Sequence, residues 1–424
     1  MAWNKCFVPR VTGCRGLRAI SGLTAGRAEL ELLLCCARSA PDAGTIQFIQ
    51  ELSVSDVNWQ RFVELASSHD VLPLVYWNLS RFCADLAPSV LMADLRQKFE
   101  TNALANLARA AELRAILQNF HDHGIGVAPF KGPVMAASLY GTPVLRSFGD
   151  LDILVRPGDV DRAKDLLFSR GYRIDEQYLP ASKHLVFVRA DWGSVVELHW
   201  AFFDPALRCR LDTRRLWNRV REVQFYGAPA PGLNPEDEIL ILAVHGANHG
   251  WPILKWVCDI AEFVRVYPDL DWRDVLKQAK CARSERMFLL GLAMAANLLG
   301  AELPPDIRMR LDAGVITALT KDACDGLLAR RKRGSVVVER AENLRRQMDY
   351  RERMLDRVAL CGHYLWDGLK SNEADCDYWK LTPQLAFLCM ALRPVRLIQV
   401  YGLRLALTTL RILFNGQRRD ATTS

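Results

Sequence analysis

The alternation of apolar and polar residues in the middle of the chain predicts a small β-sheet. Runs of strand length occur at 125–130, 150–155, 183–189 and 194–200. The last two are separated by the glycine-containing loop 190–193, which has the length of a hairpin connection. Helical spacing follows Pro133 and Asp159. We therefore expect a mixed sheet of four or five strands with helices beside it.

Helical periodicity dominates both flanks of this sheet. Between Pro88 and Gly124, apolar residues recur every four positions, which predicts a long helix with one buried stripe. From Asn234 onward, an N-cap, a proline and acidic residues open a second, almost wholly helical region. The predicted class is α+β, a small mixed sheet between mainly helical N- and C-terminal regions. The predicted parts are a basic, disordered extension at 1–27, a helical subdomain at 28–123, the core at 124–230, a helical domain at 231–377 and a basic amphipathic helical segment at 378–424.

Composition and charge are those of an ordinary globular protein with a large core. The chain has 424 residues, of which 50% are hydrophobic and 24% charged. The net charge of +7 suits a partner that carries phosphate groups. The 12 cysteines are scattered and form no C-x-x-C pair, so the sequence indicates neither a zinc site nor a disulfide scaffold. A reducing cytoplasm is the simplest location.

Three acidic residues on two predicted strands suggest a metal site. Asp150 and Asp152 are two apart in one strand, so they share a face. Glu197 and His199 share a face of a later strand. If the two strands are neighbours, three carboxylates meet, and oxygen ligands are what Mg²⁺ prefers. A solvated strand edge is the alternative for Asp150 and Asp152, and His199 is expected as a hydrogen-bonding neighbour of the site.

The turn at Lys131 and Gly132 resembles a phosphate-binding element. Glycine between a strand and a helix lets a phosphate approach the unpaired N–H groups at the helix start. Arg146 and Lys131 offer positive charge for the same purpose, although each could equally be an ordinary surface residue.

These residues together resemble the polymerase-beta-type nucleotidyltransferase superfamily, whose pattern is a glycine turn, a D-x-D strand and a third acid. The K-G, L-Y-G, R-x-x-x-D-x-D-x-L-V, G-Y and E-L-H-W motifs are similar to a bacterial family called uncharacterised nucleotidyltransferases. The central match runs from about 127 to 200, with weaker similarity at 59–76 and 245–263.

The resemblance implies a metal-dependent transfer of a nucleoside monophosphate from a nucleoside triphosphate to a hydroxyl, with release of pyrophosphate. Asp150, Asp152 and Glu197 are the expected catalytic residues and ligands of two Mg²⁺ ions, with Mn²⁺ as the alternative. Glu197 would also help to deprotonate the acceptor. Lys131, Gly132, Arg146 and His199 are the expected nucleotide-binding residues. The acceptor could be a sugar, an antibiotic-like small molecule, a peptide or a protein hydroxyl.

One departure supports a second hypothesis. Pro133 stands where the superfamily commonly has glycine or serine, and proline has no N–H for a phosphate. The alternative is a catalytically degenerate nucleotide-binding or interaction protein with the same fold. Metal-dependent pyrophosphate release separates the two.

Other motifs are more ambiguous. His245 and His249 are four apart on one predicted helix face, where packing is favoured over a metal site or a surface facing the cleft. Asp259 is a further candidate for lining that cleft. The basic run 330–333 lacks an aromatic platform, so nucleic acid is not an expected partner. The basic segment 378–424 is expected to pack on the protein, with contact to an anionic membrane surface as the alternative.

Overall fold

The computed structural model describes residues 27–175, 183–189, 194–203, 208–328 and 336–369, with a few isolated residues beyond these. The chain forms two compact units, one within 1–204 and 210–328 and the other within 205–209 and 329–424. Each unit is described by itself. The predicted extension at 1–27 and the predicted segment at 378–424 lie almost entirely outside the described residues, as does the basic run 330–333.

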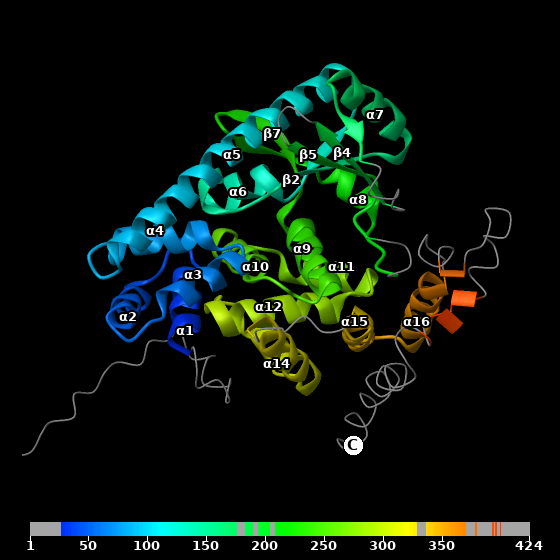
Figure 1. Cartoon of the computed structure of the whole chain (residues 1–424). Helices are drawn as coiled ribbons and strands as arrows, with labels where there is room; N and C mark the ends of the chain where they lie inside the picture. Colours follow the sequence, from blue (N-terminus) through cyan, green and yellow to red (C-terminus); the bar gives the residue numbers. More distant parts are fainter. Residues whose placement is uncertain are drawn as a thin grey trace, which may run out of the picture. The chain divides into compact units, whose positions relative to one another are not determined.

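A mixed five-stranded sheet lies in the first unit, which confirms the predicted α+β class (Figure 1). Its strands are β1 (Val127–Pro129), β2 (Asp150–Val155), β3 (Arg173–Ile174), β4 (His184–Arg189) and β5 (Ser194–His199). The spatial order is β1-β2-β5-β4-β3. Strands β2 and β5 run parallel and all other pairs are antiparallel. The expected adjacency of β2 and β5 is confirmed.

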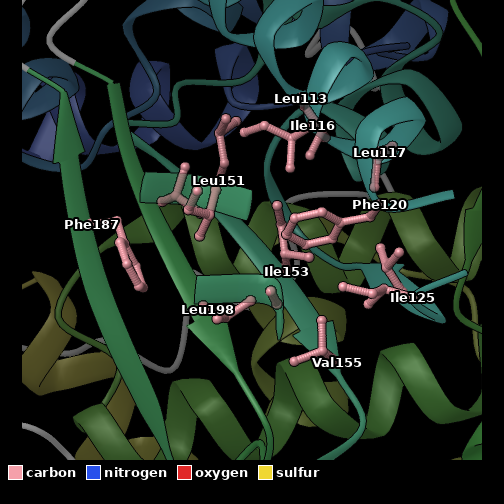
Figure 2. Packing of buried hydrophobic residues seen from close by; sticks show 14 of the residues in the cluster. Leu113, Ile116, Leu117, Phe120, Ile125, Leu151, Ile153, Val155, Phe187 and Leu198 are labelled. Carbon is pink, nitrogen blue, oxygen red and sulfur yellow. The ribbon is translucent and has the colours of Figure 1, made fainter. Parts of the chain in front are cut away.

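The long helix α5 (Ser89–Asp122) covers the apolar face of this sheet. Its residues Leu113, Ile116 and Phe120 pack against Leu151 and Ile153 of β2 in one buried cluster (Figure 2). Because side chains alternate along a strand, burying Leu151 and Ile153 here leaves Asp150 and Asp152 on the opposite face. The core thus fixes which way the acids point.

Among the described residues from 27 on, four shorter helices precede α5. They are α1 (Arg27–Cys36), α2 (Ala43–Ser53), α3 (Trp59–Ser68) and α4 (Leu72–Phe82). Asp42 caps α2 by accepting from Thr45 N at 2.7 Å, and Asn58 caps α3 by accepting from Arg61 N at 3.0 Å. These side chains bind backbone donors that have no partner within the helix.

Two helices connect the first strands. Helix α6 (Gly132–Tyr140) follows β1, and α7 (Val160–Ser169) follows β2. The short 3-10 helices η2 (Pro143–Leu145) and η3 (Pro157–Asp159) lie before and after β2. Asn106 of α5 donates to the carbonyl groups of Pro143 and Arg146, both at 2.8 Å, and so ties the loop before β2 to the long helix.

A hairpin that the sequence pattern did not predict follows α8 (Thr213–Asn218). Strands β6 (Arg221–Phe225) and β7 (Ala228–Gly232) form a separate two-stranded sheet. Tyr226 and Gly227 connect them with φ of 50° and 77°. Positive φ at both turn residues is typical of a type I′ hairpin turn.

Helices α9 to α14 complete the first unit. They are α9 (Pro235–His249), α10 (Leu254–Val266), α11 (Trp272–Cys281), α12 (Glu285–Leu299), α13 (Pro305–Leu311) and α14 (Gly314–Leu328). Helix α9 packs on α10, α11 and α12. Asn234 caps α9, as its sequence predicts.

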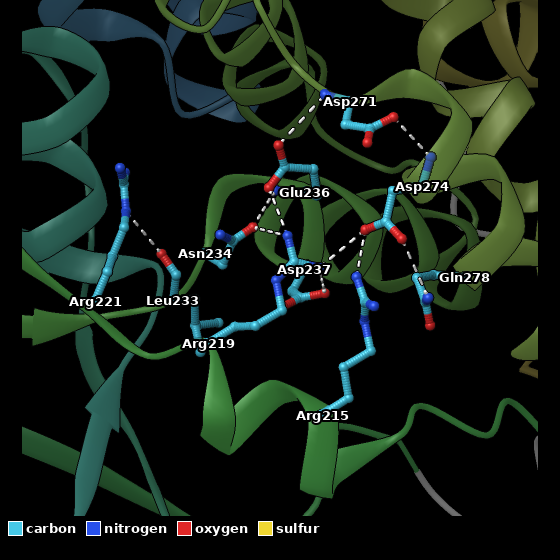
Figure 3. Close-up of polar contacts among 10 residues, drawn as sticks. All are labelled: Arg215, Arg219, Arg221, Leu233, Asn234, Glu236, Asp237, Asp271, Asp274 and Gln278. Carbon is cyan, nitrogen blue, oxygen red and sulfur yellow. Dashed lines mark hydrogen bonds and ion pairs between the residues drawn. The ribbon is translucent and has the colours of Figure 1, made fainter.

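A polar cluster around Arg219 joins the start of α9 to α8 and α11 (Figure 3). The Arg219 guanidinium donates to Asn234 at 2.6 Å, Glu236 at 2.9 Å and Asp274 at 2.9 Å. Arg215 also pairs with Asp274. Asp237 is a fourth acceptor at 3.5 Å, so one guanidinium binds four side chains from two helix starts.

The second unit contains α15 (Val336–Tyr350) and α16 (Met354–Leu369), which pack on each other. Asn343 donates to the Tyr364 hydroxyl at 3.2 Å. Among the described helices of both units, none is long and apolar enough to cross a membrane.

Candidate active site

The three predicted carboxylates meet on one face of the sheet. Asp152 of β2 is the register partner of Glu197 of β5, and Asp150 lies two residues before Asp152 on the same strand. Asp152 is 4% exposed. Glu197 has 27% of its side chain exposed. Two rigid neighbouring strands thus hold the acids in place without help from a loop.

His199 links two of these acids. Its Nε2 atom lies 3.1 Å from Asp152 Oδ1 and 3.1 Å from Glu197 Oε2. The ring is buried and stacks edge-to-face on Phe130 at 5.1 Å. His199 is therefore a hydrogen-bonding neighbour of the acids, as expected.

The turn before α6 has an uncommon backbone conformation. Lys131 and Gly132 have φ of 55° and 43°. A Cβ atom on Gly132 would lie 3.4 Å from the carbonyl oxygen of Asp150. Lys131 directs its Nζ to within 3.8 Å of Asp152 Oδ1. The turn thus brings a helix start and an ammonium group beside the acids, and a non-glycine residue at positive φ is often found at functional sites.

Arg146 lies beside the acids but is held by another partner. Its Nε and Nη2 atoms donate to the two carboxylate oxygens of Asp259 at 2.8 and 2.9 Å. Tyr140 Oη donates to the same carboxylate at 3.0 Å. Arg146 and Asp259 are 5% and 1% exposed. The expectation that Asp259 lines the cleft is wrong, because this side chain is buried as the partner of Arg146.

A cavity of about 430 Å³ brings all the predicted site residues together. Asp150, Asp152, Glu197, Lys131, Gly132, Arg146 and His199 all line it. The remaining lining includes Phe202 and Phe203 after β5 and Trp256 and Lys255 of α10. A cavity lined by acids, cations and aromatic rings is typical of a binding site for a small polar molecule with a planar part.

His245 and His249 of α9 also line this cavity. Both rings pack on Trp256, with centroid distances of 4.8 and 5.4 Å, and lie 4.6 Å from each other. Among the described residues, neither histidine belongs to a close group of three metal-ligating side chains. The two histidines and Trp256 therefore form an aromatic wall of the cavity, built from α9 and α10.

The acids have shifted pKa values. Burial raises the pKa of Asp150, and the neighbouring Asp152 and Glu197 raise it further. Burial would also raise the pKa of Asp152, but Lys131 and the hydrogen-bonded His199 outweigh it and lower that pKa. The pKa of His199 is raised because its hydrogen bonds to Asp152 and Glu197 outweigh its burial. Burial and the two neighbouring carboxylates thus make Asp150 costly to ionise, and a bound cation would offset that cost.

Some cavity residues were missed from the sequence. His184 of β4 is the register partner of His199, and the two rings stack at 4.8 Å. Lys255 of α10 pairs with Asp70 and donates to Ser147 O at 3.2 Å. The alternation of 183–189 placed His184 on a strand, but only the pairing with β5 places it in the site.

The model of a family described as "Uncharacterised nucleotidyltransferase" matches residues 55–300. Among solved structures, the chain is similar to an antigenic nucleotidyltransferase-like protein from Paracoccidioides brasiliensis, with 16% identity, a TM-score of 0.32 and coverage of 46% of this chain and 93% of that chain. No curated protein matches.

The family match covers more than half of the chain and includes all seven predicted site residues. It also includes the sheet, the turn before α6 and both helices of the aromatic wall. The protein belongs to the uncharacterised nucleotidyltransferase family and is a transferase.

Proposed function

We propose that this protein transfers a nucleoside monophosphate from a nucleoside triphosphate to a hydroxyl group of an acceptor. The acceptor oxygen forms a bond to the α-phosphorus. The bond between the α-phosphorus and the oxygen that bridges the α- and β-phosphates breaks, and pyrophosphate is released. The observation that carries the proposal is the meeting of Asp150, Asp152 and Glu197 beside the turn at Lys131 and Gly132.

Two Mg²⁺ ions are the proposed cofactor, with Mn²⁺ as the alternative. The donor set fits, because three carboxylates supply hard oxygen ligands on one cavity wall. Burial raises the pKa of Asp150, and the charges of Asp152 and Glu197 raise it further, so a bound cation would favour the ionised carboxylate. Bound divalent ions would stabilise the charge that develops on the attacking and leaving oxygens.

The side chains have distinct proposed roles. Asp150 and Asp152 hold both ions, and Glu197 holds one of them and accepts the proton of the acceptor hydroxyl. The Gly132 N–H and the Lys131 ammonium bind the triphosphate. Arg146 supports the triphosphate site from beside it, since the Nε and Nη2 atoms of its guanidinium already bind Asp259. The three converging acids favour an enzyme over a degenerate binding protein.

The aromatic wall favours a small acceptor or nucleobase over nucleic acid. The rings of Trp256, His245 and His249 line a cavity of about 430 Å³. That volume is within the range of small-ligand sites.

We place the protein in the cytoplasm, because the eight cysteines among the described residues are all free and six of them are buried.

Transfer of label from an α-³²P nucleoside triphosphate tests the proposal. The purified protein is incubated with Mg²⁺ and with sugars, aminoglycoside-like molecules, peptides or protein fractions. The proposal requires label on an acceptor with release of an equal amount of pyrophosphate, both lost on adding a chelator. Labelled acceptor in the presence of chelator would contradict it.

A further inference from the structure

We propose that His184, Glu197 and His199 form a binding site for a divalent transition-metal ion of the Zn²⁺ class, in addition to the Mg²⁺ position at the aspartates. The three potential ligand atoms lie within 4.8 Å of one another. Tetrahedral ligands about 2.0–2.2 Å from a metal lie about 3.4 Å apart, so the three side chains would have to move closer together to bind one ion.

The strand pairing holds the three side chains together. His184 of β4 is directly opposite His199 of β5 in an antiparallel register, and Glu197 is two residues from His199 on the same face. Both histidine rings already stack on each other at 4.8 Å. Two neighbouring strands of a sheet are a rigid scaffold, so little ordering is needed on binding.

The donor chemistry differs from that of the aspartate position. Imidazole nitrogen suits Zn²⁺, Fe²⁺, Co²⁺ and Ni²⁺, whereas Mg²⁺ prefers oxygen ligands. Two histidines and one carboxylate are a known ligand set of catalytic metal sites, which keep a position for water or substrate. All three side chains line the cavity, which gives the ion an entry path and that free position.

The site lies beside the proposed Mg²⁺ position and shares Glu197 with it. Its other acidic neighbour is Asp152, whose carboxylate lies 3.1 Å from His199 Nε2. An ion bound by Glu197 and His199 would replace the hydrogen bond between these two side chains. The metal present in the cavity would then decide whether Glu197 binds Mg²⁺ together with the aspartates or the transition-metal ion together with the histidines.

Titration with Co²⁺, a visible probe for such sites, tests the inference on protein without a histidine tag. The wild-type protein is expected to bind one equivalent with d–d absorption of nitrogen and oxygen ligands. His184→Asn and Glu197→Gln are expected to weaken binding by at least about tenfold. His245→Asn, which changes another cavity histidine, and Asp150→Asn are expected to bind Co²⁺ as the wild type does.

Thermal unfolding in chelator confirms that each variant is folded. Absence of Co²⁺ absorption in the wild type, equal binding by His184→Asn, or absorption dominated by thiolate charge transfer would overturn the inference. The titration contains no nucleotide, so its failure leaves the transfer proposal standing, and failure of nucleotide transfer leaves this site standing.

Discussion

Asp152 and Glu197 lie side by side at the same level of the parallel strands β2 and β5. This pairing turns two motifs that are 45 residues apart into one acidic surface. It also places both carboxylates 3.1 Å from the single nitrogen His199 Nε2. The relationship depends only on strand register, so it is a property of the fold rather than of a mobile loop.

Asp152→Asn is expected to abolish nucleotide transfer while the fold is retained. The amide keeps the shape but removes a negative metal ligand, and the loss in rate should be at least about a hundredfold. Pyrophosphate release and the thermal midpoint measure the two effects. Asp161→Asn, which changes a carboxylate with 91% side-chain exposure on α7, is the control and should leave the rate unchanged. Near wild-type release by Asp152→Asn would refute the role of this residue.

Asp259→Asn is expected to destabilise the protein by about 3–5 kcal/mol, because it leaves the buried Arg146 guanidinium without its counter-charge. Urea unfolding measures the change. The double variant Arg146→Met with Asp259→Leu should recover much of that stability, since neither charge remains buried. A loss of less than about 1 kcal/mol in Asp259→Asn would show that Asp259 is not the main partner of Arg146.

The same double variant tests whether Arg146 contacts the nucleoside triphosphate directly. If Arg146 acts only by supporting the loop before β2, the folded double variant should bind nucleoside triphosphate within a few-fold of the wild type. Complete loss of binding in a stable double variant would show that Arg146 contacts the triphosphate directly.

Glu238→Gln is expected to stabilise the protein at alkaline pH. Burial raises the pKa of Glu238 to about 7, against the backbone hydrogen bond from Lys131 and the charge of Arg221. The folded pKa exceeds the ordinary value of 4.5, so the wild-type protein keeps its full stability below about pH 4.5. It loses stability as the pH rises through about 7, because the buried Glu238 carboxyl group is then ionised. At pH 8.5 the variant should exceed the wild type by about 1–3 kcal/mol.

Urea unfolding at pH 5 and pH 8.5 measures this difference. Glu222→Gln, at an exposed position of β6, is the control and should show no such change between the two pH values. The same difference between wild type and Glu238→Gln at both pH values would contradict the assignment.

Gly132→Ala is expected to cost about 1–2 kcal/mol and to weaken triphosphate binding. Alanine at a φ of 43° is strained, and its Cβ would lie 3.4 Å from Asp150 O. Thermal unfolding and nucleotide titration measure the two effects. Gly158→Ala, where no atom lies within 4 Å of the added Cβ, should change neither. Unchanged binding by Gly132→Ala would argue against close approach of a phosphate to this turn.

Pro133→Ala is expected to strengthen triphosphate binding by roughly tenfold, because it adds an N–H at the start of α6 and hydrogen bonds to charged groups are strong. Calorimetry on the variant measures the gain. Pro157→Ala, at the start of η3, is the control. Weaker binding by Pro133→Ala would show that the rigid proline positions the turn rather than limits it.

The predicted strands that carry the acids agree closely with the structure. The range 150–155 is β2, and 194–200 exceeds β5 by one residue. Strict alternation made these strands readable. The range 125–130 is longer than β1, because only Val127–Pro129 pair with β2. The hairpin of β6 and β7 was not predicted, because Pro229 and Pro231 lack the N–H of a regular strand and argue against one at this position.

The parts of the site that could not be predicted depend on contacts between distant residues. Arg146 and Asp259 are separated by 113 residues, and nothing in either local pattern indicates their pairing. His184 enters the site through the register of β4 with β5. Trp256 enters through the packing of α10 on α9. Local patterns predict elements and faces, whereas tertiary pairing decides which faces meet.

Calorimetric titration with each of the four nucleoside triphosphates, with and without Mg²⁺, tests the central claim most directly. We expect saturable binding of at least one nucleotide that requires Mg²⁺ and disappears in Asp150→Ala. Binding to none of the four, or binding that Asp150→Ala retains in full, would contradict it.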